Sequence, residues 1–424
     1  MFLSVLSILL LLSSVIQGRS FTYKQIHQMP KSVEKDYYIW RFLCQGNCTS
    51  SQAKKIIKEA NAINKKIRSS YRKKTGSNPG SHSKRAKKAP SKQGREAWLA
   101  KISSQKYFNQ AIRQLQQGHK QRAIRHFEKA RRSATKQIDA DKASFWLYLT
   151  TQKKAYLHLL LTSWDVNLYT LVARDKMHIR YPKTMTPRLP KKNLRYYSEQ
   201  DPIQWARIKK KLFKPGTNLT ALANDYETEE SIGVYTYIKT EASHQKNIYY
   251  PMPYRTLMER FPKVRQALIY AIARQESRFV PASVSRSFAL GMMQIMPFLV
   301  KHIAKERGEK IDLDEMFNPH KAIIYANHHL DYLTGYLYHP LFIAYAYNAG
   351  IGFTKRLLQK PDYFRKGNYE PYLSMEKIDN IQAREYGKKV LVNYIIYINK
   401  LGISTRISNY IKVLTLPSKT DGFR

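Results

Sequence analysis

The sequence predicts a mainly α-helical protein, with a helical superhelix of the α-solenoid kind in its N-terminal part and an α-rich domain after it. Residues 96–173 contain five apolar segments that are typical of successive helical hairpins, with Gly118 in one turn. The apolar residues between Val264 and Ile272 recur at the spacing of one helix face. Together these patterns favour helices packed on helices along the whole chain.

The hairpin around Gly118 resembles one tetratricopeptide unit, but no second clean copy follows it, so we expect a loose solenoid rather than a regular repeat array. A stretch rich in Gly, Ser, Pro, Lys and Arg has no apolar period, which is typical of a linker. The expected segments are a signal peptide at 1–20, an N-terminal helical segment at 21–74, a basic flexible linker at 75–95, an α-superhelical domain at 96–250, an α-rich domain at 251–409 and a C-terminal tail at 410–424.

The chain is strongly basic: 74 Lys and Arg against 30 Asp and Glu give a formal net charge of +44 over 424 residues. This charge favours an anionic partner, which can be a nucleic acid, an anionic lipid surface or an acidic wall polymer. The basic runs are not accompanied by zinc-finger spacing, an RNA-binding aromatic signature or a phosphate-binding glycine loop. We therefore expect no nucleic-acid partner, whereas association with a cell-wall or membrane surface fits the charge.

The first residues are typical of an export signal. Phe2–Ile16 is an apolar run that is short for a membrane span, which needs roughly twenty residues. The Gly-Arg-Ser sequence at 18–20 offers small residues for cleavage; an uncleaved membrane anchor is the alternative. In an exported chain, Cys44 and Cys48 predict a local disulfide, with metal binding or two reduced thiols as other interpretations. We expect no metal site and no cofactor.

One carboxylic acid lies where a proton donor is expected. Glu276 lies near the C-terminal end of the helix that begins near Val264, and we expect Pro281 to end that helix. Burial and the negative end of the helix dipole both raise the pKa of a carboxyl group. A glutamic acid that stays protonated near neutral pH can serve as a general acid. Taken alone, Glu276 could instead be a surface residue paired with Arg274 or Arg278.

Three further motifs follow Glu276-Ser277 in the chain: Gly291-Met292-Met293-Gln294, Asn318-Pro319 and Ala346-Tyr347-Asn348. In this order they resemble the motifs of the soluble lytic murein transglycosylases, whose catalytic domain has a goose-type-lysozyme-like fold. The family pattern is a Glu-Ser pair, a Gly-Leu-Met-Gln turn, an Asn-Pro helix start and an Ala-Tyr-Asn segment. The resemblance covers roughly residues 251–401 and includes the Tyr-Pro-Met-Pro-Tyr sequence at 250–254.

The resemblance implies a bacterial periplasmic enzyme with a lytic transglycosylase domain at 251–409. Its substrate would be the peptidoglycan glycan strand, cleaved at the β-1,4 bond between N-acetylmuramic acid and N-acetylglucosamine. Glu276 would act first as acid and then as base, leaving a 1,6-anhydro end without water. The oligomeric state stays open. The residues that the resemblance assigns to substrate binding are Ser277, Met293, Gln294, Tyr347 and Asn348.

The sequence departs from the family pattern at three positions. Met292 replaces the leucine of the glycine turn, which conserves volume. Phe288 stands where the family usually has glycine, and we expect it to narrow the cleft. Gln382 stands where the family has a glutamate before Thr-Arg, which leaves that substrate contact open, because the nearby Glu385 is out of register by three.

Two alternative functions remain. A lysozyme-like peptidoglycan hydrolase on the same fold would differ in using water, rather than the sugar's C6 hydroxyl, as the attacking group. A noncatalytic cell-wall-binding scaffold would use the helical array, but it would have no need of an acid such as Glu276 together with Tyr347 and Asn348.

Overall fold

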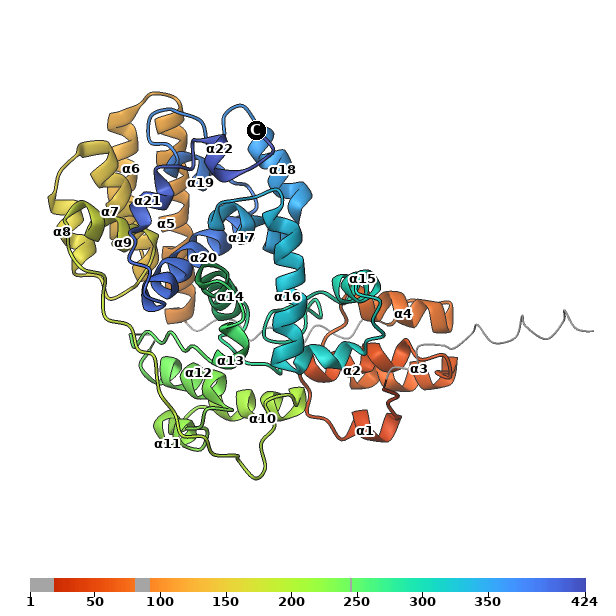
Figure 1. Ribbon diagram of the computed structural model, residues 1–424. Helices are drawn as coiled ribbons and strands as arrows, with labels where there is room; N and C mark the ends of the chain where they lie inside the picture. Colours follow the sequence, from red (N-terminus) through yellow and green to blue (C-terminus); the bar gives the residue numbers. More distant parts are fainter. Residues whose placement is uncertain (1–18, 81–91, 245) are drawn as a thin grey trace, which may run out of the picture. The chain divides into compact units, whose positions relative to one another are not determined.

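The computed structural model of the chain describes residues 19–80, 92–244 and 246–424 (Figure 1). These residues form helices and a few isolated β-bridges, with no extended strand among them. The prediction of a mainly α-helical fold is confirmed. Residues 1–18 of the predicted signal peptide and 81–91 of the predicted linker lie outside the described residues. Of the helices described, none has both the length and the apolar character needed to cross a bilayer.

The described residues form two compact units, each made from segments that are distant in the sequence. The first unit contains the described residues before 81, together with Lys192–Asn218 and Val280–Ala326. The second contains the described residues from 92 to 191, together with Leu219–Phe279 and Asn327–Arg424. The boundary after residue 326 falls within α16 (Pro319–Thr334). The contiguous domain boundaries expected from the sequence stay predictions.

Short capped helices make up most of the first unit. The side chains of Ser32, Thr49 and Asn64 each accept a hydrogen bond from a first-turn backbone amide, which fixes where three of these helices begin. Such caps satisfy amides that have no partner inside the helix. The elements of the first unit are α1 (Tyr23–His27), α2 (Val33–Leu43), α3 (Ser50–Ile56), η1 (Ile57–Glu59), α4 (Lys65–Thr75), α10 (Pro202–Leu212), α15 (Pro297–Glu306) and η2 (Leu313–Phe317).

Phe288 joins the 280–326 segment to α2 within this unit. Its ring stacks on Trp40 with centroids 5.5 Å apart and meets Tyr37 edge-on at 5.9 Å. The side chain is 0% exposed, so the expectation that Phe288 narrows a cleft is wrong: the ring faces the core instead. Its backbone is left-handed (φ 62°), a conformation that glycine adopts without steric cost.

An ion cluster joins the same two parts of the first unit. Arg41 lies 2.8 Å from a carboxylate oxygen of Asp312 and 2.8 Å from one of Asp314. The Tyr37 hydroxyl also donates to Asp314 at 2.7 Å. Burial alone would raise the pKa of Asp312, but the hydrogen bonds from Arg41 and nearby amides lower it below its usual value. The N-terminal helices are therefore part of the structural core around residues 280–326.

Cys44 and Cys48 are free thiols in this structure, so the predicted disulfide is not formed. The reason is that the two side chains have different neighbours. The exposed Cys44 lies with its Sγ 3.4 Å from the hydroxyl of Ser70, whereas the buried Cys48 points its Sγ at the carbonyl oxygen of Thr49, 3.7 Å away. Burial raises the pKa of the Cys48 thiol.

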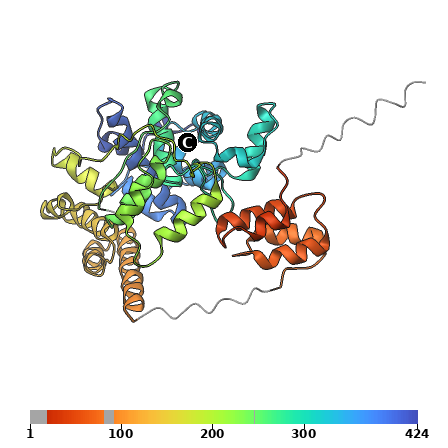
Figure 2. The ribbon, with the colours of Figure 1, turned by 90° about the horizontal axis from the view of Figure 1, so that it is seen from below.

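The second unit begins with successive packed helices. Each of the helices from α5 to α9 contacts the next, as Figures 1 and 2 show, which confirms the predicted helical hairpins. Phe127 and Trp146, both fully buried, stack between α6 and α7 at 5.6 Å. The elements of this unit are α5 (Lys92–Gln116), α6 (Lys120–Arg132), α7 (Gln137–Thr151), α8 (Ala155–Leu161), α9 (Leu168–Lys176), α11 (Leu219–Asn224), α12 (Ile232–Ala242), α13 (Arg255–Met258), α14 (Lys263–Glu276), α17 (Pro340–Ala349), α18 (Ile351–Gln359), α19 (Tyr372–Lys377), α20 (Ile381–Lys400), α21 (Ile407–Ile411) and α22 (Pro417–Thr420).

Helix α20 packs against both α14 and α17 and so organises the rest of this unit. The Tyr-Pro-Met-Pro-Tyr segment is tied to this helix group by tyrosine hydroxyls: Tyr270 donates to the Pro253 carbonyl at 2.9 Å, and Tyr397 donates to the Pro251 carbonyl at 3.0 Å. The apolar face predicted for α14 is buried except at its start, where Val264 is 55% exposed. The segment before α14 therefore fixes the position of the helix that carries Glu276.

Candidate active site

Helix α14 ends at Glu276, several residues before Pro281. The residues that reverse the chain are Arg278 and Phe279, whose φ angles of 54° and 66° are left-handed. Such a conformation costs a non-glycine residue about 1–3 kcal/mol and recurs at functional sites. The Phe279 ring is buried against the tyrosine cluster of α14 and α20, which holds the reversal in place. Glu276 is thus presented at a rigid helix end.

The carboxyl group of Glu276 has one tyrosine as its hydrogen-bond partner. The hydroxyl of Tyr386, on α20, donates to Oε1 of Glu276 at 2.7 Å. Burial raises the pKa of Glu276 to about 7, and the hydrogen bond from Tyr386 opposes that shift. The side chain stays partly exposed. A carboxyl group with this pKa is protonated in a large fraction of molecules near neutral pH and can still meet a substrate.

The Ala-Tyr-Asn motif lies in the last turn of α17, in the same unit as Glu276. The Tyr347 ring lies 5.7 Å from that of His329. Burial raises the pKa of Tyr347 well above its usual value, and the charge of Glu276 adds to the effect. Asn348 is partly exposed beside it. Tyr347 and Asn348 thus lie in the last turn of α17, and their predicted contacts with the substrate stay predictions.

Ser277 is mostly buried directly after the acid. Its backbone amide donates to the Ala273 carbonyl at 3.1 Å, and its hydroxyl lies 3.4 Å from the same oxygen. These contacts close the last turn of α14. The structure therefore gives Ser277 a part in shaping the helix end, and its predicted substrate contact stays a prediction.

The Gly-Met-Met-Gln turn belongs to the first unit. A Cβ on Gly291 would lie 1.9 Å from the carbonyl oxygen of Met316, and its φ of 74° is left-handed, so glycine is required twice over. The Gln294 amide donates to the carbonyls of Ser283 and Gly291, at 3.2 and 2.9 Å. Met293 is 0% exposed. Gln294 thus stabilises the turn by hydrogen bonds, and Met293 is packed in its core. Their predicted contacts with the sugar stay predictions.

A comparison with protein families agrees with these motifs. The transglycosylase SLT domain matches residues 258–369, which include the Glu-Ser pair, the glycine turn, the Asn-Pro pair and the Ala-Tyr-Asn segment. Within that range, Asn318 caps the helix after it, because its side-chain oxygen accepts from the Lys321 amide at 3.0 Å.

Residues 258–369 are therefore similar to a transglycosylase SLT domain.

Solved structures extend the likeness beyond the SLT domain. An inactive glutamate-to-glutamine mutant of the lytic transglycosylase Slt from Pseudomonas aeruginosa matches with a TM-score of 0.50 and 16% identity, over 91% of this chain and 66% of that one. The 70 kDa soluble lytic transglycosylase from Escherichia coli matches with a TM-score of 0.48 and 18% identity, over 92% of this chain and 68% of that one. At such identities the likeness is one of fold, and this chain spans just under two thirds of the Pseudomonas protein. No curated protein matches by sequence.

Tyr386 is the site residue that the sequence did not reveal. It lies on α20, outside the range matched by the SLT domain. Its neighbour Gly387 lets α20 approach α17 closely, because a Cβ there would lie 2.1 Å from the Tyr345 ring. The Tyr-Gly pair at 386–387 lies in the segment after Gln382, which the family comparison had already singled out. That pair is the signal that could have identified Tyr386.

The two α20 side chains considered from the sequence lie apart from the Glu276–Tyr386 pair. Gln382 is exposed in the first turn of the helix. Glu385 lies 3.0 Å from the Lys388 ammonium and 3.1 Å from Arg384, so its charge is already compensated. Neither supplies a second catalytic carboxylate. The described residues also contain no group of three or more His, Cys, Asp or Glu side chains that could hold a metal ion.

Proposed function

We propose that this protein is a peptidoglycan lytic transglycosylase that cleaves the β-1,4 bond between N-acetylmuramic acid and N-acetylglucosamine. The observation that carries the proposal is the Glu276 carboxyl group at the end of α14 in an SLT domain, with a pKa of about 7 and a single tyrosine hydrogen bond. Glycosidases that use water as the attacking group generally rely on two carboxylates. One acid with a pKa near neutrality suits a reaction in which the same group donates and later reclaims a proton.

In the first step, protonated Glu276 donates its proton to the glycosidic oxygen. The bond from that oxygen to C1 of the N-acetylmuramic acid breaks, and the bonding electrons stay with the leaving N-acetylglucosamine hydroxyl. The positive charge that develops at C1 is stabilised by the sugar's own N-acetyl group. Glu276 is left as a carboxylate that the Tyr386 hydroxyl can stabilise, because its hydrogen bond favours the charged form.

In the second step, the Glu276 carboxylate removes the proton from the C6 hydroxyl of the same sugar. The C6 oxygen bonds to C1 and leaves a 1,6-anhydro ring, while Glu276 is again protonated. No water is consumed, and the attacking group is already held near C1, which lowers the entropic part of the barrier. Tyr347 and Asn348 lie on α17 near Glu276 and would orient the N-acetyl group.

The test is digestion of purified sacculi followed by mass analysis of the released muropeptides. We expect products with 1,6-anhydro ends, which are one water lighter than reducing ends. Reducing ends alone would support a hydrolase on the same fold. No Glu276-dependent product at all would support a noncatalytic wall-binding scaffold.

We also propose that the protein acts in the periplasm after removal of residues 1–20, because the leader sequence has the form of a cleaved signal. The position that would become the new N-terminus is well held: Phe21 is 5% exposed, and it exchanges hydrogen bonds with Gln45 at 2.6 and 3.0 Å. N-terminal sequencing of the protein from fractionated cells tests this. A mature chain that begins at Met1 would instead support an uncleaved anchor.

A further inference from the structure

A pocket of about 670 Å³ lies within the second unit, separate from the Glu276 carboxyl group. One part of the lining comes from residues 135–138 and 164–169, which include the starts of α7 and α9. Another part comes from α12, the end of α14 and one face of α20. Glu276, Tyr347 and Tyr386 are not among the lining residues. The pocket is therefore a second concave surface beside the candidate active site.

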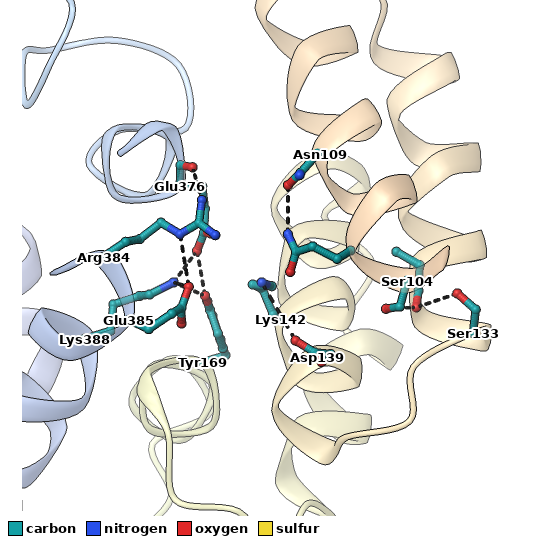
Figure 3. A network of polar contacts seen from close by, with 12 residues as sticks. Ser104, Asn109, Ser133, Asp139, Lys142, Tyr169, Glu376, Arg384, Glu385 and Lys388 are labelled. Atoms are coloured by element: carbon teal, nitrogen blue, oxygen red, sulfur yellow. Dashed lines mark hydrogen bonds and ion pairs between the residues drawn. The ribbon is translucent and has the colours of Figure 1, made fainter. Parts of the chain in front are cut away.

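Three lining residues, Tyr169, Glu385 and Lys388, belong to a network of polar contacts drawn in Figure 3, and we call these three residues and Glu376 the floor. The Lys388 ammonium lies 2.9 Å from Glu376 and 3.0 Å from Glu385, and the Tyr169 hydroxyl donates to Glu376 at 2.7 Å. Glu376 carries its charge because Lys388, Lys142 and Arg384 lower its pKa to about 2 against the opposing effect of burial. The floor charges thus compensate one another and hold the floor rigid.

The pocket lining carries more positive than negative charge, although Arg278 is paired with Glu241 at 2.8 Å. Its charged residues are Lys136, Arg274, Arg278, Lys388 and Lys389 against Asp165 and Glu385. The Arg274 guanidinium hydrogen-bonds to two neutral acceptors, the Tyr249 carbonyl at 2.9 Å and the Asn393 side-chain oxygen at 2.7 Å. Lys136 and Lys389 are both exposed and both line the pocket. Among the lining residues outside the floor, Asp165 is the one carboxylic acid; burial raises its pKa, and the charges of Lys389 and Arg274 oppose that rise. The walls therefore favour an anionic group.

An exposed aromatic side chain stands at the same pocket. Trp164 is 43% exposed and lines the wall beside Asp165. A large indole that stays in water loses the free energy of burial unless a ligand covers it. A flat apolar face next to ammonium groups fits a peptide or sugar that also carries carboxylates.

The pocket lies close to the acid along two helices. On α14 and just beyond it, Gln275 and Arg278 line the pocket on either side of the Glu276-Ser277 pair. On α20, Lys389 follows Tyr386 by three residues, and residues three apart are neighbours on a helix surface. A ligand in the pocket would therefore contact residues that are direct neighbours of Glu276 and Tyr386 along the two helices.

We propose that this pocket binds the acidic stem peptide of the murein strand, so that Lys389, Lys136 and Arg274 receive its carboxylates and Trp164 covers its apolar part. The proposal rests on the proposed function, since it takes the substrate to be peptidoglycan. It adds a recognition element that reads the peptide rather than the sugar. The pocket thereby favours strands that still carry acidic peptides over naked glycan.

The test uses the full chain with Glu276→Gln, so that no probe is consumed, and measures binding by isothermal titration calorimetry. The probes are muramyl dipeptide, which carries an acidic peptide, and chitotetraose, which has no carboxylate. We expect Lys389→Glu and Trp164→Ala each to weaken muramyl dipeptide binding about tenfold, as expected for loss or reversal of a charge-assisted contact or a stacking face. Chitotetraose binding should be unchanged in both.

Lys412→Glu is the matched control, because Lys412 is an exposed lysine of the same unit that does not line the pocket. It should leave both affinities unchanged, and Lys389→Arg should restore dipeptide binding. The proposal is overturned if the Glu276→Gln chain does not bind the dipeptide, or if the two pocket variants bind it normally. If the chain with Glu276 intact does not cleave sacculi while the Glu276→Gln chain shows pocket-dependent dipeptide binding, this proposal is kept and the proposed function is refuted. Cleavage of sacculi without pocket-dependent dipeptide binding would refute this proposal and leave the proposed function in place.

Discussion

Burial acts on two glutamates of the second unit, yet their pKa values are shifted in opposite directions. Glu276 at the end of α14 has a pKa raised to about 7, whereas Glu376 on α19 has one lowered to about 2. Burial raises the pKa of both. The difference lies in the partner: a tyrosine hydroxyl for Glu276, and an ammonium 2.9 Å away for Glu376.

The comparison shows how one helix supports two kinds of carboxyl group. Tyr386 and Lys388 both belong to α20, two residues apart, and project to different neighbours. The neutral partner leaves Glu276 able to exchange a proton near pH 7. The charged partner makes Glu376 a permanent anion that holds α9, α19 and α20 together. The hydrogen-bond or ion-pair partner thus decides whether a glutamate on this helix group exchanges protons or serves as a fixed charge.

The largest effect is expected from Glu276→Gln. The amide keeps the shape of the side chain but cannot donate a proton, and general acid catalysis typically contributes about 10²–10⁴-fold. We expect sacculus digestion to fall by at least the upper end of this range, since one group performs both proton transfers. Circular dichroism should show an unchanged fold. Near-normal turnover by this variant would show that another residue is the acid.

Lys388→Met is expected to lower the free energy of unfolding strongly, just as Glu276→Gln is expected to lower catalysis strongly. Removing the ammonium takes away the cation that lies 2.9 Å from Glu376, and breaking a buried pair costs about 3–5 kcal/mol of unfolding free energy. Urea denaturation measures the loss. The matched control is Lys389→Met on the same helix, where the lysine is exposed and the change should stay within about 0.5 kcal/mol. Equal losses of unfolding free energy in Lys388→Met and Lys389→Met would show that the Lys388 ammonium has no special structural role.

The pH dependence of stability should have opposite signs at the two glutamates. The raised pKa of Glu276 means that the folded protein binds an extra proton between the unfolded value of 4.5 and about 7, so stability falls as pH rises through that window. Glu276→Gln should therefore stabilise the protein at pH 8 by on the order of 2–3 kcal/mol, with no difference at pH 4.

Glu376 should behave in the reverse sense, because its folded pKa is about 2 against an unfolded 4.5. Its stabilising contribution is present above pH 4.5 and is lost as pH falls through that window. Thermal denaturation of Glu376→Gln and Glu276→Gln across pH 3–8 measures both slopes. Parallel pH profiles for the two variants would show that their environments do not differ in this way.

The smallest effect is expected from Tyr386→Phe. The tyrosine hydrogen bond lowers the pKa of Glu276, so its loss should raise that pKa further. Because the protonated acid starts the reaction, the alkaline limb of the pH–rate profile should move to higher pH, with a smaller loss of rate than in Glu276→Gln. Tyr394→Phe, on the same helix but hydrogen-bonded to Tyr410, is the control. A limb that does not move would mean that Tyr386 does not act on Glu276.

Local pattern was enough to predict much of the fold and part of the site. The helical hairpins and the helix before Glu276 follow from apolar spacing, which depends on neighbours in sequence. The raised pKa of Glu276 was expected from the same apolar run, and burial is its main cause in the structure. Tyr347 was predicted from a contiguous motif, and its contact with the substrate stays a prediction.

What could not be predicted depends on contacts between distant segments. Tyr386 reaches Glu276 from 110 residues away, and no local spacing reports that distance. Phe288 looked like an obstruction because its partner, Trp40, lies in a segment without any catalytic motif. The pair Cys44 and Cys48 suggested a bridge by spacing alone, whereas the direction of each side chain is set by helix packing around it.

The stacking of Phe288 on Trp40 also bears on how the chain is made. Residues of the first unit that touch each other, such as Arg41 and Asp312, are synthesised 271 residues apart. At about 5–20 residues per second, the early helices wait roughly 15–55 s before their partners exist. During that interval the aromatic face of α2 has no native cover. The first unit is thus completed late in synthesis.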